Sequence, residues 1–249
     1  MSPLPYRAAL FLAVCSFSCQ AKDADITDLT NTKELGPCEQ IKYIRYSQDG
    51  SEVQNPSGVI QKLSECLAVI PNAPANTKAA ALTLRSIAYA QRREYGHAIK
   101  DREEALLLAP ARSAWAIIGL AALYRENGQP EQALKMLQKM LQDNIGMTGK
   151  GTSPGMPSYY HLGVTLISLK RWPDAAEALS EGMSYQSNYL WAYAYRALAY
   201  DQMGLSSFAL ADMEKVRLLV NQKKEDDRSK TLQLLSEEPF AEIKKKYMK

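Results

Sequence analysis

The stretch of sequence that comes nearest to a catalytic motif is residues 151–155, Gly-Thr-Ser-Pro-Gly. It fits G-x-S-x-G, a pattern that presents an activated serine in many hydrolases. Such a serine is a nucleophile only on a tight strand-to-helix turn backed by a sheet, with a histidine and an acid around it. The sequence predicts helices on both sides of Ser153, and His161 belongs to the next helix. We therefore expect a connecting loop here and no catalytic residue.

Phosphate and metal chemistry are not supported by the spacing of the residues either. Residues 149–152, Gly-Lys-Gly-Thr, resemble part of a phosphate-binding loop. The lysine is not followed by Ser or Thr, however, and Asn144 stands where that motif has its first glycine. The only histidines, His97 and His161, lie far off in the sequence, and no metal-ligand spacing exists. The sequence therefore predicts no metal and no cofactor.

The elements around these stretches follow a pattern that recurs along the chain. A small residue recurs at steps of 35, 42 and 34 residues, at Ala98, Ala133, Ala175 and Ala209. Twelve positions before each of them lies another small residue: Ser86, Ala121, Gly163 and Ala197. Small residues let two antiparallel helices approach closely, and large residues fill the space around the contact. The pattern predicts four successive helix pairs.

This pattern resembles the tetratricopeptide (TPR) repeat, a helix-turn-helix unit of about 34 residues. Residues 159–163, Tyr-x-x-Leu-Gly, are close to the first-helix consensus of that family, and residues 175–179, Ala-x-x-x-Leu, match the second helix. The resemblance covers about residues 79–220. Gly182 departs from it by replacing the usual alanine, which affects local packing. The chain is similar in plan to exported or lipid-anchored TPR proteins of bacterial envelopes.

The resemblance implies an all-α fold, a right-handed α-solenoid of four TPR helix pairs over residues 79–220. We expect residues 22–78 to form an N-terminal extension with a degenerate repeat. Residues 221–249 would form a charged linker and a capping helix. The degenerate unit and the capping helix would hide apolar surface at the two ends of the stack. The glycine- and proline-rich stretch Asn144–Pro157 predicts an exposed loop between the second and third repeats.

Residues 1–21 have the features of an export signal. Arg7 precedes an apolar run over Ala8–Ser18, which is shorter than the roughly 20 residues of a spanning helix and has the length of a signal-peptide core. The segment resembles either a cleaved signal peptide or the lipobox of a bacterial lipoprotein, with the lipid on Cys19 or Cys15. In both cases we expect an exported protein, periplasmic or anchored at the outer membrane of a bacterium. That lipid would be its only contact with a membrane.

Export changes how the remaining cysteines are interpreted. Cys38 and Cys66 form an even pair in an oxidising compartment. A disulfide between them would contribute on the order of 3–4 kcal/mol to stability. The alternative is two buried thiols.

In TPR proteins the first helices line a concave face that commonly binds a peptide or a partner helix. The positions of this face that we expect to form a partner-binding groove are Trp115, Ile118, Arg125, Tyr160, Val164, Trp191 and Asp201. Trp, Tyr and Arg are the residues that most often dominate binding energy. The alternative is that Trp115 and Trp191 seal the packing between neighbouring repeats.

The resemblance therefore implies a non-enzymatic protein–protein interaction scaffold or adaptor, whose partner is another protein or a peptide. A structural subunit of a bacterial envelope assembly is the alternative. The net charge of +3 is small, and it gives no argument for binding nucleic acid.

Overall fold

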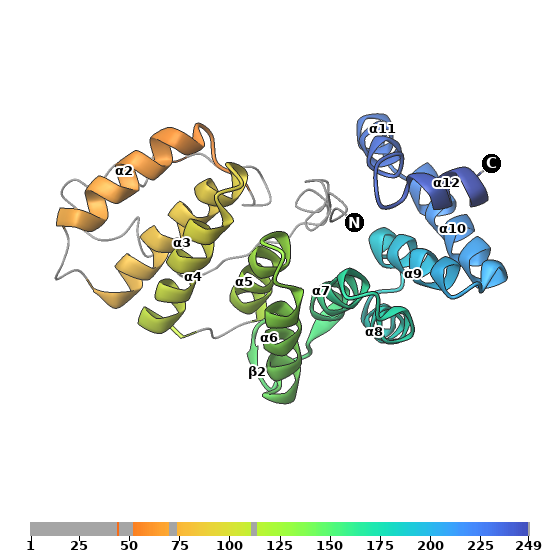
Figure 1. Cartoon of the computed structure of the whole chain (residues 1–249), viewed down its shortest axis with the longest axis horizontal. Coiled ribbons are helices and arrows are strands. Elements are labelled where there is room, and N and C mark those ends of the chain that lie inside the picture. Colours follow the sequence, from red (N-terminus) through yellow and green to blue (C-terminus); the bar gives the residue numbers. More distant parts are fainter. Residues whose placement is uncertain (1–43, 45–51, 70–73, 111–113, 249) are drawn as a thin grey trace. The chain divides into compact units, whose positions relative to one another are not determined.

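The structure is a computed structural model of the 249-residue chain, and it describes residues 44, 52–69, 74–110 and 114–248. In these ranges the chain forms eleven helices and one short hairpin (Figure 1). They divide into two compact units, one with helices α2–α4 and the other with helices α5–α12. The predicted export signal over residues 1–21 lies outside the described residues.

The first unit consists of α2 (Pro56–Val69), α3 (Ala75–Gln91) and α4 (Tyr95–Leu108). α3 and α4 form the helix pair of the first repeat, and α2 packs against α3. Three residues of α2 at helical spacing belong to the core that α2 shares with α3: Val59, Leu63 and Cys66. α2 therefore takes the place expected for the second helix of the degenerate leading unit, and it shields α3 from water.

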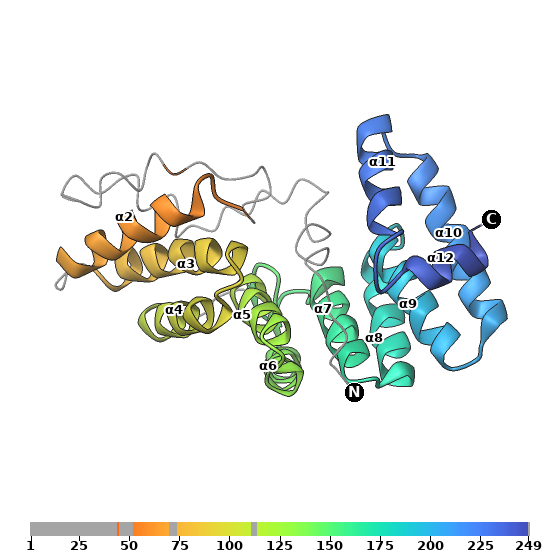
Figure 2. The ribbon, with the colours of Figure 1, turned by 45° about the horizontal axis from the view of Figure 1, so that its top comes forward.

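The second unit contains the other three repeats and the end of the chain. Its helices are α5 (Ala114–Glu126), α6 (Pro130–Gln142), α7 (Gly155–Ser168), α8 (Trp172–Tyr185), α9 (Leu190–Gln202), α10 (Ser206–Asn221), α11 (Glu225–Leu234) and α12 (Ala241–Tyr247). They pack as consecutive pairs, α5 with α6, α7 with α8, and α9 with α10 (Figure 2). The first helices also touch, α5 with α7 and α7 with α9, and so form one row. α12 packs on α9 and α10, which confirms the predicted capping helix.

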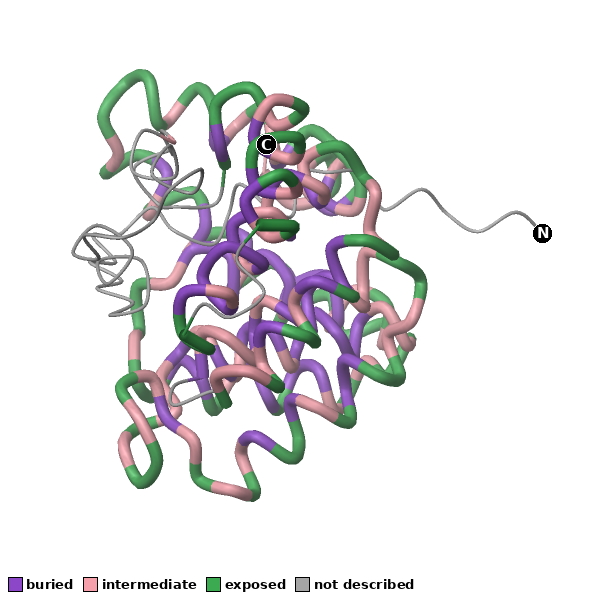
Figure 3. Tube along the Cα trace, turned by 90° about the vertical axis from the view of Figure 1, so that its left-hand side faces the viewer, coloured by how far each residue is buried: buried purple, intermediate pink, exposed green. Residues whose placement is uncertain are grey.

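Small residues lie where the two helices of a pair come closest. A Cβ atom added to Gly163 of α7 would lie 2.6 Å from Cγ of Leu179 on α8. A Cβ added to Gly182 of α8 would lie 2.8 Å from Sδ of Met156 and 2.8 Å from Cβ of Tyr159, both on α7. The two helices approach so closely at position 182 that a side chain larger than that of glycine would overlap the facing helix. Figure 3 shows buried residues gathered along the helix faces that meet their neighbours.

The predicted loop over Asn144–Pro157 contains a short hairpin. β1 (Ile145–Gly146) pairs antiparallel with β2 (Gly149–Lys150). The Met147 N–H donates to the Ser153 carbonyl at 2.9 Å, and the Gly151 N–H donates to the Asn144 carbonyl at 2.6 Å. Backbone hydrogen bonds therefore give this insertion a defined conformation just before α7.

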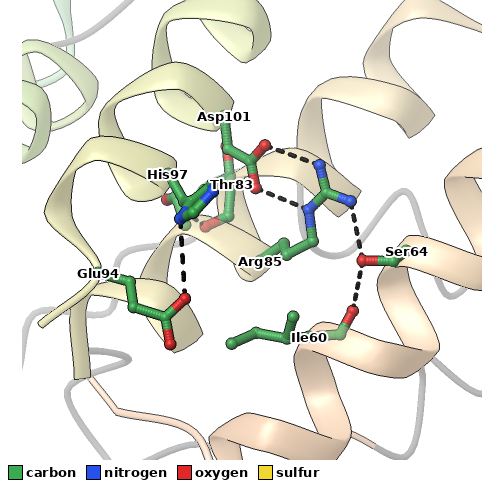
Figure 4. A network of polar contacts seen from close by, with 8 residues as sticks. Ile60, Ser64, Thr83, Arg85, Glu94, His97 and Asp101 are labelled. Carbon is green, nitrogen blue, oxygen red and sulfur yellow. Dashed lines mark hydrogen bonds and ion pairs between the residues drawn. The ribbon is translucent and has the colours of Figure 1, made fainter. Parts of the chain in front are cut away.

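The Arg85 side chain joins the three helices of the first unit. The Arg85 guanidinium on α3 donates to both carboxylate oxygens of Asp101 on α4, at 2.7 and 2.8 Å. It also donates to Ser64 Oγ on α2 at 3.0 Å, and that hydroxyl donates to the Ile60 carbonyl at 2.7 Å (Figure 4). The Asp101 side chain is only 6% exposed. The hydrogen bonds between Arg85 and this carboxylate raise the pKa of Arg85, although burial of the guanidinium opposes that shift.

The same arrangement recurs in the last repeat. Arg196 on α9 donates to both carboxylate oxygens of Asp212 on α10, at 2.8 and 2.7 Å. It donates to Ser180 Oγ on α8, the preceding second helix, at 2.8 Å. In both repeats the aspartate follows the arginine by 16 residues. The sequence alone does not reveal these arginine–aspartate pairs. A spacing of 16 residues indicates a contact only once the two helices are known to pack as a pair.

The two middle repeats have apolar residues in the same places. Leu120 and Met136 stand there in the second repeat, and Leu162 and Ala178 stand there in the third. These four residues are buried or half-buried. The same fold therefore accepts either an ion pair or an apolar pair between its two helices.

The apolar pair at the equivalent positions of the second repeat provides a test of the ion pair between Arg196 and Asp212. Asp212→Met leaves the guanidinium without its carboxylate, so it should lower the free energy of unfolding by about 3 kcal/mol. The double variant Arg196→Leu with Asp212→Met copies the second repeat and should stay within about 1 kcal/mol of the unchanged protein. Urea unfolding measures both variants. A double variant as unstable as the single one would contradict this account.

Candidate functional site

The structure places all seven predicted groove residues on the first helices of the second unit. Trp115, Ile118 and Arg125 lie on α5, Tyr160 and Val164 lie on α7, and Trp191 and Asp201 lie on α9. Because α7 touches both α5 and α9, one row of helices carries them. The repeat phase read from the sequence therefore brings these residues into neighbouring helices.

Most of these residues are covered by other side chains. Ile118, Tyr160, Val164 and Trp191 are buried, with between 1% and 7% of their surface exposed. Arg125 keeps 6% of its side chain exposed and Asp201 keeps 17%. Trp115 is half-buried. A partner-binding role of this row stays a prediction, and Trp115 and Asp201 are its more accessible members.

The end of the chain covers the part of the row that belongs to α9. We call residues 235–247 the C-terminal segment. Its Phe240 ring lies 5.6 Å from the Trp191 ring and 4.7 Å from the Tyr195 ring, between centroids. Its Leu235 and Ile243 are buried in the same cluster. Trp191 therefore seals the packing between α9 and the C-terminal segment.

Two polar contacts fix the far end of the same segment. Lys246 Nζ and the Tyr247 hydroxyl both donate to Asp201 Oδ1, each at 2.6 Å. Partial burial of Asp201 opposes ionisation, but these two hydrogen bonds outweigh it and hold the pKa of that carboxyl below its usual value. Asp201, predicted to face a partner, is thus paired with the chain's own last helix.

A buried polar cluster lies between α5 and α7. The Arg125 side chain donates a long hydrogen bond of 3.4 Å to Thr165 Oγ1, and its Nε lies 3.9 Å from Glu126 Oε1. His161 is 2% exposed, and neither of its ring nitrogens has a hydrogen-bond partner within the described part of the chain. Burial, reinforced by the positive charge of Arg125, holds the pKa of His161 well below its usual value. The imidazole is therefore neutral near pH 7.

The surroundings of Ser153 differ from those of a hydrolase nucleophile. Its hydroxyl accepts a hydrogen bond from the Gly155 N–H at 3.2 Å, as in a local turn. The stretch before it belongs to the small hairpin, which is the one sheet of the described residues. The backing sheet that the G-x-S-x-G mechanism needs is therefore missing from this place.

The other predicted sites fall partly outside the described residues. Cys66 is fully buried on α2, but Cys38, Cys19 and Cys15 lie outside the described ranges. The predicted disulfide and lipidation therefore stay predictions. Among the described residues, no three side chains of His, Cys, Asp or Glu are grouped as metal ligands would be. None of the described helices has the length and apolarity needed to cross a bilayer.

The sequence matches no protein-family model and no curated protein. Solved structures do match the fold. The crystal structure of MamA covers 71% of this chain and 92% of its own, with a TM-score of 0.55 and 21% identity. MamA from residue 41 to its end, from Desulfovibrio magneticus RS-1, covers 81% of this chain and 98% of its own, with a TM-score of 0.59 and 16% identity.

At these identities the likeness concerns the fold alone. Together with the phased helix pairs, it settles what that fold is. The chain is a TPR-type α-solenoid. The fold class predicted from the sequence is therefore confirmed. The domain limits at residues 78 and 220 remain a prediction, and the division of the chain into its two compact units falls between residues 112 and 113 of the sequence.

His161 should make the stability of the TPR stack depend on pH. A histidine held neutral by the fold contributes stability that is fully present above its unfolded pKa of about 6.5 and is lost as the pH falls. Lowering the pH from 7 to 5 should reduce the free energy of unfolding by about 2 kcal/mol through this group. Urea unfolding at a series of pH values measures the loss.

His161→Gln has no charge to gain, so it should abolish most of that pH dependence. His97 is the matched control, because 68% of its side chain is exposed. His97→Gln should keep the pH dependence of the unchanged protein. Equal pH dependence in all three proteins would refute the role of His161.

Proposed function

We propose that this chain is a non-enzymatic scaffold or adaptor that binds a peptide or a partner helix along the row formed by α5, α7 and α9. One observation carries the proposal: α9, the last helix of this row, already holds a helix-forming segment of the same chain. The C-terminal segment sits on α9 through the Phe240 ring, which packs tilted against Trp191 and edge-on to Tyr195, and through two hydrogen bonds to the Asp201 carboxylate. Aromatic anchors beside a charge are typical of surfaces that recognise helices.

The proposal that the protein is not an enzyme rests on the surroundings of Ser153. Its hydroxyl is engaged in a local turn at the end of a hairpin. His161, the next histidine along the chain, is buried and packs its ring edge-on to Tyr160 at 5.2 Å. Neither residue is thus arranged as part of a nucleophile–base pair.

We further propose that the scaffold is exported. The apolar run Ala8–Ser18 supports this, as does an even pair of cysteines after it. Cys66 is held in the core of the first unit, so a bridge to Cys38 would anchor the chain that precedes α2. A lipid on Cys19 or Cys15 would place the same protein at a bacterial outer membrane.

A photo-crosslinking amino acid at position 115 tests the scaffold in its native envelope. Trp115 is a half-buried member of the row on α5, so a partner bound there should be crosslinked. Trp172, half-buried on the second helix α8, is the matched control and should capture no partner. Trp115→Ala should then weaken binding of the captured protein by about 2 kcal/mol, roughly 30-fold. Crosslinking from position 172 and none from 115 would point to a structural subunit held by its second helices.

The export proposal has its own measurement. Intact mass of the isolated protein should show a chain that begins at or after Cys15, most simply at Cys19 or Lys22. Cys38 and Cys66 should resist alkylation until a reductant is added. A soluble protein with residues 1–21 intact and both thiols alkylatable would exclude export.

A further inference from the structure

The C-terminal segment contacts the TPR stack as a bound peptide would. Three of its side chains are almost completely buried: Leu235, Phe240 and Ile243, with 0%, 4% and 1% exposed. Phe240 and Ile243 are three residues apart, and Lys246 and Tyr247 follow at the next turn on Asp201. Figures 1 and 2 both place α12 beside α9 and α10. The contact therefore has an apolar centre and a charged end.

The connection to the rest of the chain holds this segment mainly through partly buried contacts, because Leu232 and Leu234 of α11 are only partly buried against the same cluster. α11 joins it to α10, and Thr231 is the one buried residue of α11. The acidic first turn of α11, residues 225–227, is exposed. Lys244 Nζ donates to the Leu232 carbonyl of α11 at 2.9 Å and, within the segment, to Ser236 Oγ at 2.6 Å. The most deeply buried contacts that hold the segment on α9 and α10 are thus made by its own side chains.

We propose that the C-terminal segment is an internal occupant of a helix-binding site on α9, and that a partner helix with the same pattern replaces it. That helix carries an aromatic residue, an aliphatic residue three positions later, and Lys-Tyr three and four positions after that. The aromatic ring takes the place of Phe240 on Trp191 and Tyr195, and the lysine pairs with Asp201. This inference rests on the proposed scaffold function, because it assigns the chemistry of the partner at one end of the row.

Tethering explains how a short segment keeps the site filled. A segment joined by a short linker is present at an effective concentration of about 1 mM, so even weak intrinsic affinity suffices. A partner can bind only those molecules whose site is open, so its apparent affinity is the intrinsic affinity multiplied by the open fraction. Loosening the segment should therefore raise the apparent affinity for a helix in solution.

The probe is a labelled synthetic peptide with the sequence of residues 235–248, followed by fluorescence anisotropy on the full-length protein. Lys246→Ala with Tyr247→Ala removes the contacts to Asp201 and leaves the buried anchors in place. This double variant should bind the peptide at least threefold more tightly than the unchanged protein. Phe240→Ala with Ile243→Ala loosens the segment further and should raise the affinity at least tenfold, provided that urea unfolding shows it folded.

Two controls address the site and the pattern. Adding Asp201→Asn to the Lys246→Ala/Tyr247→Ala variant should remove most of the gain, because the lysine of the peptide loses its charged partner. A peptide with alanine in place of Phe240 and Ile243 should not bind any of the proteins. Equal peptide affinity for the unchanged protein and the Lys246→Ala/Tyr247→Ala variant, or no binding to either, would overturn the inference and make the segment a permanent cap.

The two proposals fail in different ways. If the peptide result is negative while position 115 still crosslinks a partner, the scaffold function stands and the partner binds on α5 or α7. If the peptide binds as expected while position 115 crosslinks nothing, the helix-binding site on α9 stands and binding along the whole row does not.

Discussion

Close approach of α7 and α8 is the constraint on which the middle of the second unit depends. Gly163 and Gly182 lie at two points of this contact, and a Cβ at either one would overlap side-chain atoms of the facing helix. Interiors are densely packed, so such an overlap would force the facing side chains, or the helices that carry them, to move. α7 also carries Tyr160 and His161, which are buried toward the neighbouring first helices: the Tyr160 ring lies 5.7 Å from the Tyr195 ring of α9, and His161 lies in the polar cluster with Arg125 of α5. The contact with α8 therefore fixes α7, which is the middle helix of the row.

The outer repeats add a different kind of constraint. Arg85 and Arg196 each bind an aspartate on their own second helix and a serine on the preceding second helix. A buried ion pair contributes little net stability compared with an apolar pair. Its planar geometry is met in one arrangement only, however, because the guanidinium donates in fixed directions. These contacts specify how three helices meet, while the middle repeats rely on apolar burial.

The C-terminal segment covers the part of the row of first helices that belongs to α9. A solenoid needs a cap at its end to cover apolar surface. Here the cap covers Trp191 with an aromatic ring and neutralises Asp201 with a lysine. Under the proposed function, stability and recognition would use the same side chains on α9. The proposed partner helix would have to offset the lost burial of Phe240 and Ile243 in addition to making its own contacts.

The sequence by itself determined the helix pairs, their number and the capping helix. These follow from small residues such as Ala98 and Ala175 at nearly constant spacing, and from an apolar stripe near the C-terminus, which are local and repeated signals. The sequence also identified residues that lie together on the row of first helices α5, α7 and α9, because the phase of the repeat assigns each position to a helix.

Only the tertiary structure decided which of those residues are covered and which polar groups meet. Arg85 reaches Ser64 and Asp101, and Arg125 reaches Thr165, across different helices. Trp191 is buried by Phe240, which comes much later in the chain. Spacing along one helix cannot report contacts that exist only after separate helices have packed, so burial and pairing had to come from the fold.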